Sequence, residues 1–276
     1  MSTQPSPSVR TDETDTSPCS IVVGVDHRGR SVSAVVWAVE EADRAGGSLR
    51  LVSAATHEPA DGSPAAQHDV VALARRLTVR NLKHRDVVGS PVDVLLEAAA
   101  DADLLVVGCR SLRPTQRLVL GSTSRALATR SPVPVVIVPE AWMQPSMAAA
   151  PVVAGIGPAA GDDEVLRFAL LRATRDRVPL VVVSAFEAPY LSTWSPADVK
   201  RIQSDHDAAL HARLVPWRES NPGLEIAGTA VMGPADRAIV DASRIAQLTV
   251  VGRGSTVRGV LEGAANPVAV VPGASR

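Results

Sequence analysis

Two glycine turns stand where a bound phosphate needs backbone donors. Gly108 follows the apolar run 104–107, and Gly121 precedes Ser122 and Thr123 at the start of a segment with helical character. The first N–H groups of a helix have no partner within the helix, and the helix dipole favours an anion at that end. Neither lysine of the chain follows a glycine, so a Walker loop is missing. The turns therefore predict an anion site, and nucleotide binding without a Walker loop.

An acidic side chain ends the first apolar strand. Asp26 follows the run 21–25, and Gly108 ends the fourth predicted strand. In open α/β sheets, ligands bind outside the carboxyl ends of the strands, near the point where the strand order reverses. If the first and fourth strands are neighbours, Asp26 and both glycine turns border one crevice. The carboxylate would then accept hydrogen bonds from a base or ribose while backbone N–H groups meet phosphate, an arrangement that suits an adenine nucleotide.

The elements that must hold these residues occur twice in the chain. A Val-rich strand, a helical segment and a second strand occupy residues 21–54, and the same pattern recurs at 152–185. The segments 87–108 and 231–252 correspond in the same way, and each half closes on a short apolar strand, PVVIVP or PVAVVP. We therefore predict a duplication with two units.

The strands are apolar throughout, which requires burial on both faces and indicates a parallel sheet with right-handed helical crossovers. Gly46 ends the first helical segment, and Ser90 is placed to cap another. Gly24 and Gly155, inside the first strand of each half, allow a helix to pack closely on the sheet. The predicted fold class is α/β, with two doubly wound parallel-sheet domains packed as a pseudo-dimer.

Composition describes a globular chain without a charge bias. Its 276 residues are 46% hydrophobic and 21% charged, with a formal net charge of −1. Such a balance offers no electrostatic attraction to nucleic acid or to a membrane surface, and we expect neither partner. Two cysteines, Cys19 and Cys109, do not form a disulfide framework, which favours a cytoplasmic location.

Low-complexity segments set the expected domain boundaries. Residues 1–19 are rich in Ser, Thr, Pro and acidic residues, lack the apolar core of a signal peptide, and are expected to be a disordered tail. We interpret 141–150 as a linker. The domains are then expected at 20–140 and 151–276.

From Ser20 to Pro272 the chain resembles the universal stress proteins, in their tandem two-domain form. The nucleotide motif of that family is glycine, two residues, glycine, nine residues, glycine, then Ser or Thr. These places are held here by Gly108, Ser111, Gly121 and Ser122, with serine in place of the second glycine. The resemblance implies an ATP or ADP site in the first domain, with Mg²⁺ accompanying the nucleotide.

The resemblance also implies adenine-pocket roles for Val25, Asp26 and Ala54. It implies a regulatory stress-response function, with protein partners that the sequence does not identify. We expect the nucleotide to order the loop 111–120 and so change the surface offered to a partner, because a ligand shifts an equilibrium by its differential affinity for two states.

The second repeat departs from this pattern. Gly157 takes the place of Asp26. Gly254 corresponds to Gly121, but it follows Gly252 almost directly, whereas Gly108 and Gly121 are separated by a long loop. Having lost both the base-side carboxylate and most of the phosphate loop, the second domain is predicted to be structural.

Two other functions remain open. The first is a ligand-free scaffold, in which the apolar final strands support pairing of domains or of chains into a homodimer. The second is slow ATP hydrolysis, for which Asp26 and His27 are the candidates, although both lie on the base side by the family resemblance.

Other side chains are given structural interpretations. The spacing of His206 and His211 does not fit a metal site, and we expect both on a helix surface. We expect Cys109 to be a packed or idle thiol, and Trp37 to pack in the core.

Overall fold

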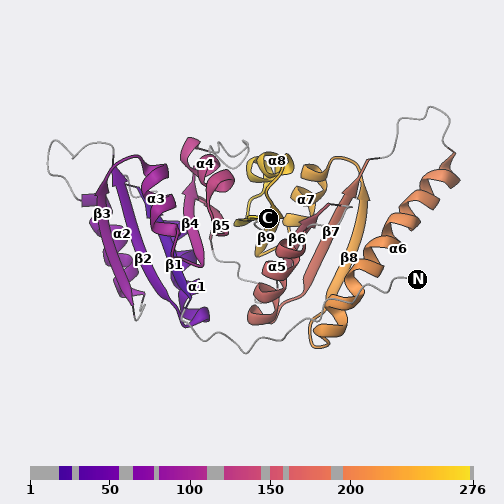
Figure 1. The fold of residues 1–276 in the computed structure, drawn as a ribbon, viewed down its shortest axis with the longest axis horizontal. Coiled ribbons are helices and arrows are strands. Elements are labelled where there is room, and N and C mark those ends of the chain that lie inside the picture. The colour runs from indigo at the N-terminus through magenta and orange to yellow at the C-terminus, as the bar shows by residue number, and fades with distance from the viewer. Residues whose placement is uncertain are drawn as a thin grey trace, which may run out of the picture.

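The computed structural model describes residues 19–26, 31–55, 65–77, 81–110, 121–143, 150–157, 162–187 and 195–273. Strands and helices alternate through these residues (Figure 1). The elements of the first half are β1 (Ser20–Val25), α1 (Val32–Ala45), β2 (Ser48–Ala55), α2 (Ala65–Arg76), β3 (Leu82–Val88), α3 (Pro91–Ala99), β4 (Leu104–Cys109), α4 (Ser122–Arg130) and β5 (Val135–Pro139). Those of the second half are β6 (Val152–Ile156), α5 (Asp163–Asp176), β7 (Leu180–Phe186), α6 (Pro196–Ser220), β8 (Ile226–Met232), α7 (Ala235–Ser243), β9 (Leu248–Gly252), α8 (Thr256–Gly263) and β10 (Val268–Val271).

The strands form one sheet of ten in the order β3-β2-β1-β4-β5-β10-β9-β6-β7-β8. Within each half the neighbouring strands are parallel, and the order reverses beside β1 in the first half and beside β6 in the second. The two halves join through an antiparallel pair, β5 with β10. The predicted fold class is confirmed: both halves are doubly wound α/β units with the same topology.

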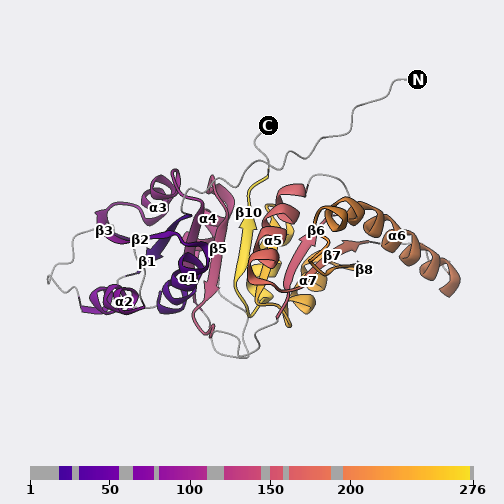
Figure 2. The same cartoon turned by 90° about the horizontal axis from the view of Figure 1, so that it is seen from below.

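Successive residues of each strand contact helices on opposite faces of the sheet. In β1, Ile21 and Val23 belong to one core with residues of α1, whereas Val22 belongs to another with Leu95 of α3 and Leu127 of α4. Figure 2 shows α1 and α3 on opposite sides of these strands. Burial on both faces explains why the strands are apolar throughout.

Two glycines set the spacing between helix and sheet, as predicted. A Cβ added to Gly24 would lie 3.0 Å from a methyl group of Leu95, and one added to Gly155 would lie only 2.4 Å from Ile239 Cδ1. Leu95 is on α3 and Ile239 is on α7, so the same close approach occurs in both halves. The close approach of α3 and α7 to the sheet therefore depends on glycine in the central strands.

Helix boundaries agree only in part with the sequence signals. Gly46 ends α1 in the left-handed conformation, with φ of 60°. Ser90 is the N-cap residue of α3, but its side chain makes no capping hydrogen bond, so that prediction was wrong in its chemistry. The backbone at Ser90 already directs the chain into the helix, and Pro91 in the first turn has no N–H to be capped.

The halves share their cores as well as their sheet. One core contains Val136 and Val138 of β5 together with Ala269 and Val271 of β10, and the other contains the alternate residues of the same strands. The division into domains at 20–140 and 151–276 stays a prediction, since the described residues show no break between them. Only part of the predicted linker 141–150 lies within the described residues, and the tail 1–19 lies almost wholly outside them. No helix among the described residues combines the length and the apolar character that crossing a bilayer requires.

Candidate functional site

A cavity of about 410 Å³ opens at the carboxyl ends of β1, β2 and β4, beside the point where the strand order reverses. It is bordered by every predicted site residue that the structure describes. These residues are Val25, Asp26, Ala54, Gly108, Gly121, Ser122 and Thr123. Ser111 lies outside the described residues. The structure thus brings residues from four separate segments to one place, while their contact with a ligand stays a prediction.

Ser31 fixes Asp26 at the base of the cavity. The N–H of Asp26 donates to Ser31 Oγ at 2.9 Å, and the Ser31 hydroxyl lies 3.2 Å from Asp26 Oδ1 and donates to it. Ser31 is buried and immediately precedes α1, so the start of that helix determines where the carboxylate sits. Ser31 was not predicted as a site residue from the sequence. Its position directly before a predicted helix could have indicated this role.

The N-terminus of α4 forms the opposite border. Gly121 is the N-cap residue and has no side chain that could cap the helix, and the first turn holds no acidic residue. The first hydrogen bond of the helix runs from the N–H of Arg125 to the carbonyl of Gly121. The N–H groups of Ser122 to Ser124 precede it and have no carbonyl partner within the helix. Donors and dipole together favour an anion here.

Ser124 joins this helix to the sheet. Its hydroxyl donates to the carbonyl oxygen of Gly108 at 3.1 Å, which links the first turn of α4 to the end of β4. The two glycine turns are therefore held together even though residues 111–120 lie between them in the chain. Ser124 is a second residue that the sequence analysis missed, and the signal was its place one residue beyond the Gly-Ser-Thr turn.

The remaining wall is largely apolar. Val52, Pro91, Leu95 and Val107 form its apolar part, and Arg110 and Glu140 also border the cavity. An apolar slot that ends in a carboxylate on one side and backbone donors on the other matches a molecule with a flat base and an anionic group. Both ends of that arrangement are provided by strand and helix termini.

Cys109 borders the cavity but is not poised to react. Burial raises the pKa of its thiol to about 12, and the negative charge of Glu140 adds to the effect. The thiol is therefore protonated at neutral pH, which agrees with the structural interpretation of this cysteine.

The corresponding place in the second half is occupied by a carboxylate. Gly157 follows β6 as Asp26 follows β1, and its N–H donates to Asp162 Oδ2 at 2.6 Å. Asp162 immediately precedes α5, the place that Ser31 takes before α1. Its Oδ1 lies 3.5 Å from the position that a Cβ on Gly252 would take. A carboxylate that precedes α5 thus stands between the ends of β6 and β9, whereas in the first half the carboxylate is that of Asp26 after β1 and a hydroxyl precedes α1.

The histidines lie away from the cavity, on α6. His211 is exposed, as expected. His206 is half-buried on the same helix, and its ring stacks on Phe186 with 3.8 Å between ring centroids, a contact that was not predicted. Within the part of the chain that the structure describes, no group of three or more His, Cys, Asp or Glu side chains is arranged to hold a metal ion. Trp37 is buried in the core, as predicted.

Comparisons with known proteins agree with this architecture. Residues 20–139 match the universal stress protein family. A universal stress protein of Mycobacterium tuberculosis is 29% identical over 257 residues, which cover 86% of each chain. A universal stress protein of Archaeoglobus fulgidus has a similar fold, with a TM-score of 0.68 at 16% identity over 92% of this chain and 98% of its own.

A further solved structure, a universal stress protein of Archaeoglobus fulgidus in complex with dAMP, is 24% identical and covers 45% of this chain and 99% of its own. Its TM-score is 0.32.

Proposed function

We propose that the first half of this chain, whose residues 20–139 match the universal stress protein family, binds one adenine nucleotide, ATP or ADP, as a regulatory ligand. The observation that carries the proposal is the single cavity bordered by Asp26, Gly108 and the start of α4. Base and ribose would face Asp26 and the apolar wall, and the phosphates would face the N-terminus of α4. Mg²⁺ would arrive bound to the phosphates.

The restriction to the first half rests on two differences in the second half. Gly157 stands where Asp26 follows β1, so no side-chain carboxylate directly follows β6, and the carboxylate of Asp162 lies instead toward β9, 3.5 Å from the position of a Cβ on Gly252. The turn from Gly252 to Thr256 is also short compared with the segment from Gly108 to Gly121. We infer that the second half serves as the structural partner of the first.

The test is thermal unfolding of the full chain with and without ATP or ADP. A nucleotide that binds only the folded state at 100 times its Kd stabilises by about 2.7 kcal/mol, which raises Tm by roughly 4–8 °C. The variant Gly121→Val, Ser122→Val should fold but show no such rise. A Cβ on Gly121 meets no atom within 4 Å, and Ser122 is exposed, so the added bulk projects only into the cavity.

No rise in Tm at millimolar nucleotide would contradict the proposal. The chain would then be better explained as a ligand-free scaffold, and the purified protein should carry no adenine nucleotide detectable by absorbance or mass spectrometry. An equal rise in the variant would place the ligand elsewhere.

A further inference from the structure

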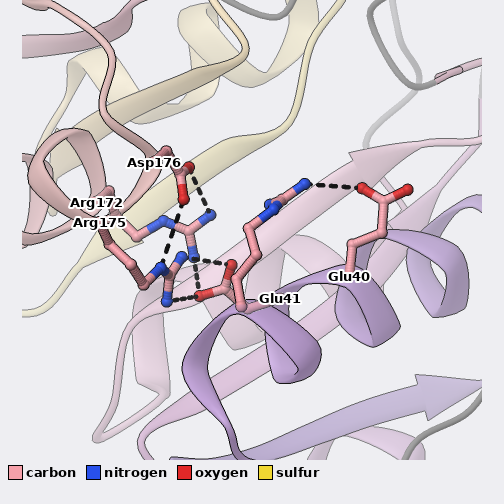
Figure 3. Close-up of polar contacts among 6 residues, drawn as sticks. Glu40, Glu41, Arg172, Arg175 and Asp176 are labelled. Atoms are coloured by element: carbon pink, nitrogen blue, oxygen red, sulfur yellow. Dashed lines mark hydrogen bonds and ion pairs between the residues drawn. The ribbon is translucent and has the colours of Figure 1, made fainter.

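Four charged side chains are enclosed between α1 of the first half and α5 of the second (Figure 3). They are Glu41, Arg172, Arg175 and Asp176. Glu41 is only 3% exposed, and Arg172 and Asp176 are each 7% exposed. We call this group the interface charge cluster.

Glu41 is the centre of the interface charge cluster. Arg175 holds its carboxylate with two nitrogens, at 2.7 Å from Oε1 and 2.8 Å from Oε2, and Arg172 forms a close ion pair with the same group. Asp176 lies 3.4 Å from Arg175 Nε and 3.9 Å from Arg172. The two positive and two negative charges balance one another.

The guanidinium of Arg172 also lies over the ring of Trp37 on α1, 5.1 Å from the ring centroid. This contact adds a cation–π attraction across the same interface. Burial lowers the pKa of Arg172, and the charge of Glu41 opposes that shift. The buried charge of Arg172 is therefore balanced in part by a carboxylate of the first half.

Glu41 and Arg172 hold equivalent positions in the two halves. Helix α1 begins at Val32 and α5 begins at Asp163, and each of these charged residues is the tenth of its helix. The strands β5 and β10 behave alike, because Val136 pairs with Ala269, its counterpart in PVAVVP. Equivalent residues therefore face each other across the interface, as in an isologous dimer.

Opposite charge at equivalent positions makes the interface selective. If two second halves met, Arg172 and Arg175 would face their own copies. If two first halves met, Glu41 would face Glu41, and Arg44, the equivalent of Arg175, is already paired with Glu40 of its own helix at 3.0 Å. Both like pairings therefore bring like charges together in a buried place, which costs more than the neutral cluster of the native pairing.

We propose that the interface charge cluster selects the pairing of the first half with the second and rejects the pairing of either half with a copy of itself. The apolar strands β5 and β10 stabilise the pairing of two halves but do not select between partners, because both strands offer a similar edge. Glu41 and Arg172 select the first half with the second over two copies of the same half. This inference is independent of nucleotide binding.

The first test is charge reversal in the full chain. Glu41→Arg and Arg172→Glu each unbalance the cluster, and we expect each to lower Tm by roughly 5–15 °C. The combination Glu41→Arg with Arg172→Glu restores the balance and should recover most of that loss. Arg258→Glu is the matched control, because it makes the same change at an exposed arginine of α8 and should shift Tm by no more than about 2 °C.

The second test separates selectivity from stability. Glu41→Met with Arg172→Met removes both charges and keeps the interface packed, so we expect it to remain folded. The variant and the native protein are each refolded from denaturant at a series of rising protein concentrations. Light scattering after size exclusion then measures the fraction of protein that is heavier than one chain. We expect this fraction to be at least about twice as large for the variant as for the native protein. The double charge-reversed variant should refold to the native distribution. If the methionine variant does not refold, Glu41→Gln with Arg172→Gln replaces it in the same assay.

Two results would overturn the proposal. One is that the Tm losses of the two single reversals add in the double variant. The other is that the neutral variant refolds to the native mass distribution at every concentration.

Discussion

At the scale of single residues, the halves differ in the pair that joins the end of the first strand to the start of the first helix. Ser31 bonds Asp26 in the first half, and Asp162 bonds Gly157 in the second. The backbone conformations agree, with φ of −88° at Ser31 and −99° at Asp162. The fold therefore accepts either pair, and the carboxylate follows the strand in the first half but precedes the helix in the second.

This equivalence gives a test in which the chain supplies its own substitution. Asp26→Gly with Ser31→Asp copies the corresponding pair of the second half into the first, and we expect it to keep the native Tm within about 2 °C while abolishing the rise in Tm on adding ATP. Thermal unfolding with and without nucleotide measures both. Gly157→Asp with Asp162→Ser is the control and should gain no nucleotide response, because the short turn at Gly252 remains. A full ATP response in the Asp26→Gly, Ser31→Asp variant would show that this pair of residues does not govern binding.

A second residue-scale prediction concerns Cys109. Its pKa is raised to about 12 because the thiol is buried, so at pH 8 the reactive thiolate is scarce. We expect a thiol probe to modify Cys109 at least about a hundredfold more slowly in the folded protein than in denaturant. The thiol of the folded protein keeps its proton to a higher pH than the thiol of the unfolded chain. The free energy of unfolding therefore falls as pH rises above 9, the ordinary pKa of a thiol. Rapid modification of folded protein, located at Cys109 by mass spectrometry, would contradict the burial argument.

At the scale of elements, glycine in a central strand determines how closely a helix approaches the sheet. The evidence is the short distance from a Cβ on Gly155 to Ile239 of α7, and the similar approach of Leu95 to Gly24. The latter contact sets α3 against the sheet where Leu95 lines the cavity.

Gly155→Ala should therefore destabilise the protein by about 1–3 kcal/mol through overpacking. Ile239→Val removes the methyl group that the new Cβ would strike, so the same Gly155→Ala change should cost less in that background. Urea denaturation of the four proteins measures the coupling. Gly254→Ala is the control, since a Cβ there meets nothing within 4 Å and should have a near-zero effect. Equal costs in the two backgrounds would mean that helix spacing is not set by this contact.

Much of each element could be predicted from sequence, because apolar strands and helical periodicity are local signals. The duplication gave the equivalence of Gly157 with Asp26 and of Gly254 with Gly121. The hydroxyl contacts of Ser31 and Ser124 could not be predicted in detail, because they depend on how a helix start meets a strand end in space.

At the scale of the whole molecule, the two halves share one sheet and its cores. Val136 and Ala269 pair at the centre of a sheet that runs through both halves, and residues from both fill each of the two large cores. Isolated halves would expose these strands and the apolar surface around them. Experiments on ligand binding are therefore best made on the full chain.

The interface charge cluster could not be identified from sequence, although its members were visible. Glu41 and Arg172 were ordinary charged residues of two amphipathic helices until the antiparallel pairing of β5 with β10 brought the helices together. The available signal was opposite charge at equivalent positions of a repeat.

The central claim is that one nucleotide binds per chain, in the first half. The most direct measurement is an amide chemical-shift titration of the full chain with ATP, which reports on both halves at once. The account predicts shifts at Asp26, Gly108 and residues 121–123, with no change at Gly157 or residues 252–256. Shifts at residues 252–256, or none at residues 121–123 under millimolar ATP, would contradict it.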